Sequence, residues 1–451
     1  MYKITRHFCA SQSSRQFNIK NLVIGRDAHH SCKVLVVGGG TGGCTMAAKF
    51  VNKFKGSKDQ VIVVEPNEKH YYQPLFTLIG GGIKPLKSSY KLMEKVLPKD
   101  SKWVKDRVTK FDPESNTVTV GSGDSIQYEY LIVALGLQLC WNKIPGLQEA
   151  LENPEVPVCS IYGPDTVEKV FKTIKATKTG TAYFTFPNTP VKCPGAPQKI
   201  AYIAEDYWRN KKKLKDINVT YNTALPVIFG VKKYADALWK VCQSRNILVN
   251  LQTNLIEIKP STNEAVFQNL KNPEELNTYS MLHVSPPMGP PEVLKNHPKL
   301  TNEVGFLNVD PQTLRHSKYG NIFGIGDCTN TPNSKTMAAI AAQSKVVYEN
   351  ISSDMSERSS IEVYNGYASC PLVTGYGKCI LAEFDYKLQP VETFPINQAK
   401  EYFAMYLLKK DFFPFLYWNL MLKGHWNGPA TFRKYLHFFS KKGIAHTTKT
   451  Q

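Results

Sequence analysis

The chain has 451 residues, of which 42% are hydrophobic and 21% are charged, so it is long enough for two or three domains with their own cores. Its formal net charge of +19 favours an anionic partner, such as a membrane surface or an anionic substrate. Nucleic acid is not expected as a partner, because the sequence has no Lys/Arg block on one predicted helix and no paired CxxC with zinc spacing. No metal site is predicted.

The first residues have the composition of a mitochondrial import presequence. Residues 1–26 contain Lys, Arg and Ser but no acidic residue, which is typical of such a segment. We therefore interpret residues 1–30 as a presequence that is cleaved before Cys32; the alternative is a disordered basic tail. No run of eighteen apolar residues occurs in the sequence, so a membrane-spanning helix is not expected.

The next segment predicts a dinucleotide site. An apolar strand, Val34–Val37, leads into Gly38, Gly40 and Gly43 in G-x-G-x-x-G spacing, then a helix, then a strand that ends at Glu65. The first glycine permits a tight turn, the second lets a pyrophosphate approach the backbone, and the third lets helix and strand pack closely. The acid accepts a hydrogen bond from a ribose hydroxyl, and the helix start supplies a positive field.

Two later segments point to a flavin. The apolar strand Tyr130–Gly136 ends in glycine, and Asp327 follows another strand just before a helix that is predicted to start near Ser334. An acid there can bond the ribityl chain of a flavin. With the first motif, these segments resemble the pyridine nucleotide–disulfide oxidoreductase family, whose first Rossmann domain holds FAD. The resemblance covers most of residues 31–345.

A second Rossmann unit is predicted over about 178–300, with strands "TAYFTF" and "INVTY" on either side of a helix at about 196–209. Its ligand chemistry is missing. No G-x-G-x-x-G joins strand to helix, and Pro187, Pro190 and Pro194 remove backbone donors that a pyrophosphate needs. The second strand also ends without an acid. We therefore expect a scaffold without a nicotinamide site, and electrons that reach the flavin from a small donor.

Two cysteines stand out among ten that form no disulfide framework, most of which we expect to be reduced. Cys193 is predicted at a helix N-terminus beside Lys192, where the pKa of a thiol is lowered; the alternative is a buried structural cysteine. Cys370 precedes Pro371 and, like Cys193, is predicted to lie in a turn that contains proline. Cys379 falls in a predicted strand and is interpreted as structural.

The C-terminal part is rich in aromatic residues with basic flanks. Pro414, Gly424 and Pro429 are predicted to break it into short helices. Such a segment favours the plane of an anionic membrane interface; the alternative is a helical hairpin packed on the core. The aromatic residues are Tyr402, Phe403, Tyr406, Phe412, Phe413, Phe415, Tyr417, Trp418, Trp426, Phe432, Tyr435, Phe438 and Phe439.

Five stretches, "EKHYYQPLFTL", "FTFPNTPVKCPGAPQK", "IFGVKKYADAL", "NIFGIGDCTN" and "SCPLVTGYGKCILAEFDY", resemble the mitochondrial sulfide:quinone oxidoreductases. The resemblance runs from about residue 31 to the end of the chain. It implies a redox-active pair, Cys193 and Cys370, beside FAD. The FAD contacts that it implies fall on Gly43, Cys44, Glu65, Gln73, Val108, Asp327 and Lys335.

The resemblance also implies the reaction. Hydrogen sulfide attacks a sulfur bridge between Cys193 and Cys370, the sulfane sulfur stays on Cys370 as a persulfide, and an acceptor such as glutathione or sulfite removes it. Two electrons pass through FAD to ubiquinone, on an enzyme bound peripherally to the mitochondrial inner membrane. The alternatives are a type II NADH:quinone oxidoreductase-like enzyme and a non-catalytic flavoprotein that serves as a binding module.

The predicted fold class is α/β, with two Rossmann-like (doubly wound) domains and a C-terminal aromatic-rich helical membrane-binding segment. The presequence would occupy residues 1–30. The FAD-binding domain would be discontinuous, with residues 31–150 and 301–375. The second Rossmann-like domain, without an NAD motif, would span 151–300, and the quinone- and membrane-binding region would span 376–451.

Overall fold

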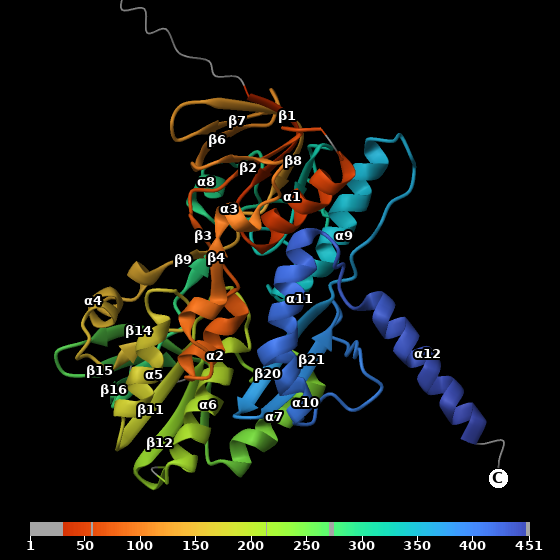
Figure 1. Cartoon of the computed structure of the whole chain (residues 1–451). Coiled ribbons are helices and arrows are strands. Elements are labelled where there is room, and N and C mark those ends of the chain that lie inside the picture. The colour runs from red at the N-terminus through yellow and green to blue at the C-terminus, as the bar shows by residue number, and fades with distance from the viewer. Residues whose placement is uncertain (1–29, 56, 213, 270–274, 448–451) are drawn as a thin grey trace, which may run out of the picture.

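The computed structural model of the chain describes residues 30–55, 57–212, 214–269 and 275–447, with side chains up to residue 438. The predicted presequence, up to residue 29, lies outside the described residues. A mixed sheet and a parallel sheet, each with flanking helices, form the body of the protein, and helices of the C-terminal segment pack against it (Figure 1). The predicted α/β class is confirmed.

The first sheet carries the dinucleotide motif. Its strand order is β5-β2-β1-β8-β7-β6, and β19 pairs with the second half of β8. Val34–Val37 are all buried and pair in parallel with the strands on both sides, as the apolar run predicts. The strands are β1 (His30–Val37), β2 (Val61–Val64), β5 (Lys102–Val104), β6 (Val108–Asp112), β7 (Thr117–Val120), β8 (Ser125–Val133) and β19 (Ile322–Gly324).

Helices α1 and α9 pack together on this sheet. The helix predicted near Ser334 begins at Met337, because the side chain of Thr336 caps it by accepting a hydrogen bond from the Ala339 N–H at 3.2 Å. The elements around the sheet are α1 (Thr41–Lys53), β3 (Lys69–Tyr71), β4 (Tyr90–Leu92), α3 (Met93–Val96), α8 (Glu292–Lys295) and α9 (Met337–Asp354). Helix α2 (Phe76–Gly80) packs instead against helices of the second sheet.

The second sheet is parallel throughout, in the order β10-β17-β11-β12-β13. Its strands are β10 (Val158–Cys159), β11 (Gly180–Phe186), β12 (Ile217–Thr223), β13 (Leu248–Leu251) and β17 (Met281–His283). Its helices are α4 (Leu147–Glu152), α5 (Val167–Ala176), α6 (Ala196–Asn210) and α7 (Lys232–Ser244). Beside it lie the antiparallel strands β14 (Thr253–Lys259), β15 (Glu264–Asn269) and β16 (Glu275–Thr278), and the pair β9 (Gln138–Leu139) and β18 (Met288–Gly289). The predicted strands and helix of the second Rossmann unit are therefore present.

A hairpin of β20 (Ala368–Gly375) and β21 (Lys378–Phe384) packs against α6. Cys370 lies inside β20, opposite Ala382, so the prediction that Cys370 lies in a turn was wrong. Pro371 follows Cys370 within the same strand. Such a proline is tolerated because this sheet has two strands, so each strand has an edge that needs no ladder hydrogen bond.

The C-terminal helices are α10 (Phe403–Leu407), a π-helical turn (Leu408–Phe412), α11 (Phe413–Asn419) and α12 (Ala430–Thr447). Pro414 does not break this segment, contrary to the prediction, because it sits in the first turn of α11 directly after the π-helical turn. Gly424 does end a short turn, in a left-handed conformation with φ of 81°. Helix α12 extends away from the body (Figure 1). Within the part of the chain that the structure describes, no helix is long and apolar enough to cross a bilayer.

Candidate active site

A cavity of about 940 Å³ runs from the dinucleotide loop to the C-terminal helices. Near the loop it is lined by Gly38, Gly40, Glu65, Gln73, Val108, Asp327 and Lys335. Gly43 and Cys44 are predicted cofactor contacts that do not line it. Cys44 is buried in α1, where its thiol donates to the Gly39 carbonyl at 3.1 Å.

Two glycines of the loop, Gly38 and Gly43, are required by close backbone approaches. Gly38 has φ of 101°, and a Cβ there would lie 2.6 Å from the Ala134 carbonyl oxygen. A Cβ at Gly43 would lie 1.7 Å from the Gly38 carbonyl oxygen, so this glycine lets helix and strand pack closely. A Cβ at Gly40 would meet no atom within 4 Å, and Gly40 faces the cavity. The loop therefore leaves room for a pyrophosphate at Gly40.

Glu65 lies directly after β2 and is 7% exposed. Its carboxylate accepts hydrogen bonds from the Gly39 N–H at 2.6 Å and the Asn67 N–H at 2.7 Å. These bonds hold the acid against the loop at the wall of the cavity. Loop, acid and cavity fit a bound dinucleotide.

Asp327 and two lysines form a charged cluster at the same cavity. Burial raises the pKa of Asp327, and the positive charges of Lys335 and Lys192 oppose this shift. Burial lowers the pKa of Lys192 to about 8. Lys335 donates to the Thr329 carbonyl at 2.9 Å, which holds its ammonium group beside the acid.

The structure brings the two predicted cysteines together. The sulfur of Cys193 lies 3.8 Å from the sulfur of Cys370, and both are free. Cys193 adopts φ of 53°, and its N–H donates to the Lys335 carbonyl at 2.8 Å. Gly195 makes the approach possible, because a Cβ there would lie 2.6 Å from the sulfur of Cys370. Strand β20 and the start of α6 thus meet at these two sulfurs.

Lys199 is a cation at this pair that sequence reasoning missed. It is 2% exposed, and its Nζ lies 3.2 Å from the sulfur of Cys193 and 3.7 Å from that of Cys370. Burial alone lowers the pKa of Lys199, but the nearby sulfurs raise it above its usual value. Lys199 lies in the first turn of α6, six residues after Cys193. The position of a lysine one turn into the predicted helix could have indicated that its ammonium group lies near Cys193.

The two thiols have different pKa values. A hydrogen bond from Cys370, followed by the positive charges of Lys199 and Lys409, holds the pKa of Cys193 well below its usual value despite burial. The same hydrogen bond, together with burial, raises the pKa of Cys370. These shifts favour the thiolate form at Cys193 and the thiol form at Cys370. A thiolate is the nucleophilic form, and it is also the better leaving group in thiol–disulfide exchange.

Lys409 comes from the π-helical turn of the C-terminal segment and is 3% exposed. Its Nζ donates to the Pro74 carbonyl at 2.8 Å, and burial lowers its pKa to about 8. Lys409 also lines the cavity. Sequence reasoning counted this lysine only as a basic flank of the aromatic segment, because no local pattern shows that it turns inward toward the cysteines.

The sequence of the chain is similar to those of known proteins. Residues 32–167 match the family model of pyridine nucleotide-disulphide oxidoreductases. The chain is 50% identical to the mitochondrial sulfide:quinone oxidoreductase of Mus musculus over 412 residues, which cover 91% of this chain and 90% of that protein. It is 45% identical to the mitochondrial sulfide:quinone oxidoreductase of Dictyostelium discoideum over 88% of both chains. The chain belongs to the mitochondrial sulfide:quinone oxidoreductase family.

The solved structures agree with this membership at the level of the fold. The sulfide:quinone oxidoreductase of Aquifex aeolicus superposes with a TM-score of 0.77 at 20% identity, over 90% of this chain and 95% of that one. Membership in the sulfide:quinone oxidoreductase family confirms that the chain is an enzyme of the flavin-dependent oxidoreductases. The resemblance stated from the sequence is therefore confirmed, while the roles of single residues stay predictions.

Proposed function

We propose that this protein oxidises hydrogen sulfide at Cys193 and Cys370 and passes two electrons through FAD to ubiquinone. The observation that carries the proposal is the pair of sulfurs 3.8 Å apart, with the Lys199 ammonium at 3.2 Å from Cys193. Cys193 and Lys199 line the same cavity as the dinucleotide loop. A lowered thiol pKa beside a cation marks a reactive cysteine. The family membership supplies the substrates.

The residues that would hold FAD are those that wall the loop end of the cavity. Gly38 and Gly40 would cradle the pyrophosphate, Glu65 would accept from a ribose hydroxyl, and Asp327 would bond the ribityl chain. Lys335 supplies positive charge beside Asp327, which favours a reduced, negatively charged ring. When bound, FAD supplies a two-electron acceptor that can pass its electrons on to a quinone.

The sulfide step starts from an oxidised bridge between the two cysteines. HS⁻ attacks the sulfur of Cys370, a new sulfur–sulfur bond forms there, and the bond to Cys193 breaks with its electron pair staying on Cys193. The products are a Cys370 persulfide and a Cys193 thiolate, so sulfide is oxidised by two electrons and the bridge is reduced. The ammonium groups of Lys199 and Lys409 stabilise the thiolate as it forms.

The persulfide then needs a nucleophile that takes its outer sulfur. Glutathione thiolate or sulfite would attack that sulfur and leave Cys370 as a thiolate. The pair is then reduced and holds the two electrons that sulfide gave up, which would pass to FAD as the bridge re-forms. Both acceptors are anions, and the formal net charge of +19 favours their approach.

The C-terminal segment is proposed to bind the face of the mitochondrial inner membrane and the quinone. Phe403 is 62% exposed, Phe415 58% and Tyr435 61%, whereas Tyr417 is fully buried. Exposed aromatic side chains beside lysines suit a membrane interface, and the buried ones attach the segment to the body. Truncation at about residue 400 is expected to abolish binding to vesicles that contain anionic lipid; unchanged binding would contradict this assignment.

The test is anaerobic addition of sulfide to the purified flavoprotein while the flavin absorption is recorded. We expect sulfide to bleach the flavin, and Cys193→Ser and Cys370→Ser to prevent bleaching. Bleaching by NADH instead would favour the NADH:quinone alternative, and no bleaching by either reductant would favour a non-catalytic flavoprotein.

A further inference from the structure

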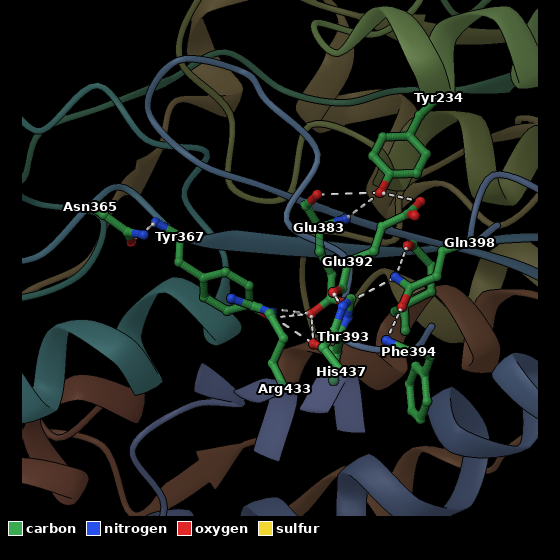
Figure 2. A network of polar contacts seen from close by, with 11 residues as sticks. Tyr234, Asn365, Tyr367, Glu383, Glu392, Thr393, Phe394, Gln398, Arg433 and His437 are labelled. Carbon is green, nitrogen blue, oxygen red and sulfur yellow. Dashed lines mark hydrogen bonds and ion pairs between the residues drawn. The ribbon is translucent and has the colours of Figure 1, made fainter. Parts of the chain in front are cut away.

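A buried carboxylate on the last strand of the hairpin lines the cavity, as do residues of the C-terminal segment. Glu383 in β21 is 2% exposed. Its oxygens accept from the Tyr367 hydroxyl at 2.6 Å, from the N–H and hydroxyl of Thr393 at 2.7 and 2.6 Å, and from the Gln398 amide at 2.8 Å (Figure 2). An ionised carboxylate can only accept hydrogen bonds, so this set of donors fits a fixed negative charge.

The counter-charge comes from α12, which otherwise extends away from the body. Arg433 Nη2 lies 3.6 Å from Glu383 Oε1, and the Arg433 side chain is 17% exposed. Its guanidinium also stands over the Tyr367 ring, 4.9 Å from the ring centre. One turn later on the same side of the helix, His437 bonds the Glu392 carbonyl at 3.1 Å. Figure 2 shows these side chains converging on the segment that follows β21.

The network is also a wall of the cavity. Tyr367, Glu383 and Thr393 line it, together with Phe432, the residue before Arg433. Lys434, the residue after Arg433, is exposed. Arg433 thus connects the wall of the cavity to the first turn of a helix whose other face carries the exposed Tyr435.

We propose that Arg433 is a positioning residue for quinone binding: its pairing with Glu383 holds the first turn of α12 in place as one wall of the cavity, on the segment that is proposed above to bind the quinone. This rests on the proposed function, because it assigns a role at the quinone side of the same site.

The proposal follows from what a broken pair would do. A buried carboxylate that loses its cation is strongly unfavourable, so Glu383 would recruit water into the cavity or the first turn of α12 would shift. Either change disturbs the wall that includes Phe432. Among the described residues, no hydrogen bond or ion pair joins Cys193 or Lys199 to this network. The sulfide chemistry is therefore not expected to depend on the pairing of Arg433 with Glu383.

The experiment compares Arg433→Met with Lys434→Met in the full-length flavoprotein. Both variants remove one positive charge from α12, so any general electrostatic effect on the helix is matched. Activity is measured in detergent, without vesicles, with a short-chain ubiquinone analogue, which separates quinone binding from membrane binding. Flavin reduction by sulfide is followed separately in a rapid-mixing instrument. Thermal unfolding with bound flavin shows whether each variant folds.

We expect Arg433→Met to raise the KM for the quinone by about tenfold, which corresponds to about 1.4 kcal/mol, because the wall that includes Phe432 shifts, with the rate of flavin reduction unchanged. Lys434→Met should behave like the unmodified protein. In the double variant with Glu383→Gln, the effect on KM should be smaller than the product of the two single effects.

Three results would overturn the proposal: an unchanged KM in Arg433→Met, an equal rise in Lys434→Met, or single effects that multiply in the double variant. If Arg433→Met does not fold, Arg433→Gln is judged by the same criteria. Failure of the proposed function itself would appear differently, as no reduction of the flavin by sulfide in the unmodified protein.

Discussion

Lys199→Met removes the cation nearest to the reactive sulfurs while keeping most of the side-chain volume. At 3.2 Å from Cys193, a unit charge contributes about 5 kcal/mol at an effective dielectric constant of about 20. This value is an upper estimate, since Lys409 remains and the cavity can admit water. A net loss of about half of it would raise the pKa of Cys193 by roughly two units.

This shift should slow the sulfide step, because Cys193 is the leaving group in the proposed attack of HS⁻ on the bridge at Cys370. Exchange is slower when the leaving thiol has a higher pKa. With a slope near one half, two pKa units correspond to roughly a tenfold slower reaction. The assay is rapid-mixing flavin reduction by sulfide, together with the pH dependence of Cys193 alkylation in the reduced protein.

The matched control is Lys211→Met, which removes an exposed lysine directly after the end of the same helix. It should leave both measurements unchanged. If the alkylation profile of Cys193 does not move in Lys199→Met, the ammonium group does not stabilise the thiolate, and the reasoning is refuted whatever happens to the overall rate.

Three further predictions concern the cofactor, the packing and the pH dependence. Glu65→Ala removes the proposed ribose acceptor and should leave purified protein with less bound flavin per chain, measured by absorption; full occupancy would contradict that role. Gly195→Ala places a Cβ 2.6 Å from the sulfur of Cys370, so it should lower the free energy of unfolding by about 1–3 kcal/mol and slow flavin reduction by sulfide; unchanged values of both would show that the site relaxes. Burial lowers the pKa of His70 to about 4 from 6.5, so the unfolded state binds more protons between these values, and up to about 3 kcal/mol of stability should be lost as pH falls from 6.5 to 4. His70→Gln should show a weaker dependence in denaturant titrations at several pH values, and an equal slope would contradict the assignment.

The dinucleotide site could be predicted from the sequence because its parts are local. Strand, loop, helix and second strand follow one another from Val34 to Glu65, and the close contact that requires Gly43 lies within this stretch. The atom that leaves no room for a side chain at Gly38 is the Ala134 carbonyl oxygen, at the end of another strand. The reason for this glycine is therefore seen only in the folded chain.

The chemistry around the cysteines was less predictable because it is assembled from distant segments. The sequence marked Cys193 and Cys370 but could not show that they meet, since β20 reaches α6 only through packing of the hairpin. Lys409 arrives from a π-helical turn, a form of helix that is rare and has no simple sequence pattern. The pairing of Arg433 with Glu383 could not be predicted either. It depends on where α12 begins after Pro429, which places Arg433 beside a carboxylate from a distant strand.

The proline-rich junction between β11 and α6 has a physical explanation in this arrangement. In a nicotinamide domain the loop and helix start at that position bind a pyrophosphate with backbone N–H groups. Here Pro187, Pro190 and Pro194 lack such groups, and Gly195 instead admits the sulfur of Cys370 to the start of the helix. In the proposed function, the anion near the helix start would be the Cys193 thiolate, with the ammonium group of Lys199 from the first turn beside it. The same scaffold would then accept electrons from sulfide at the position where a nicotinamide domain binds its nucleotide.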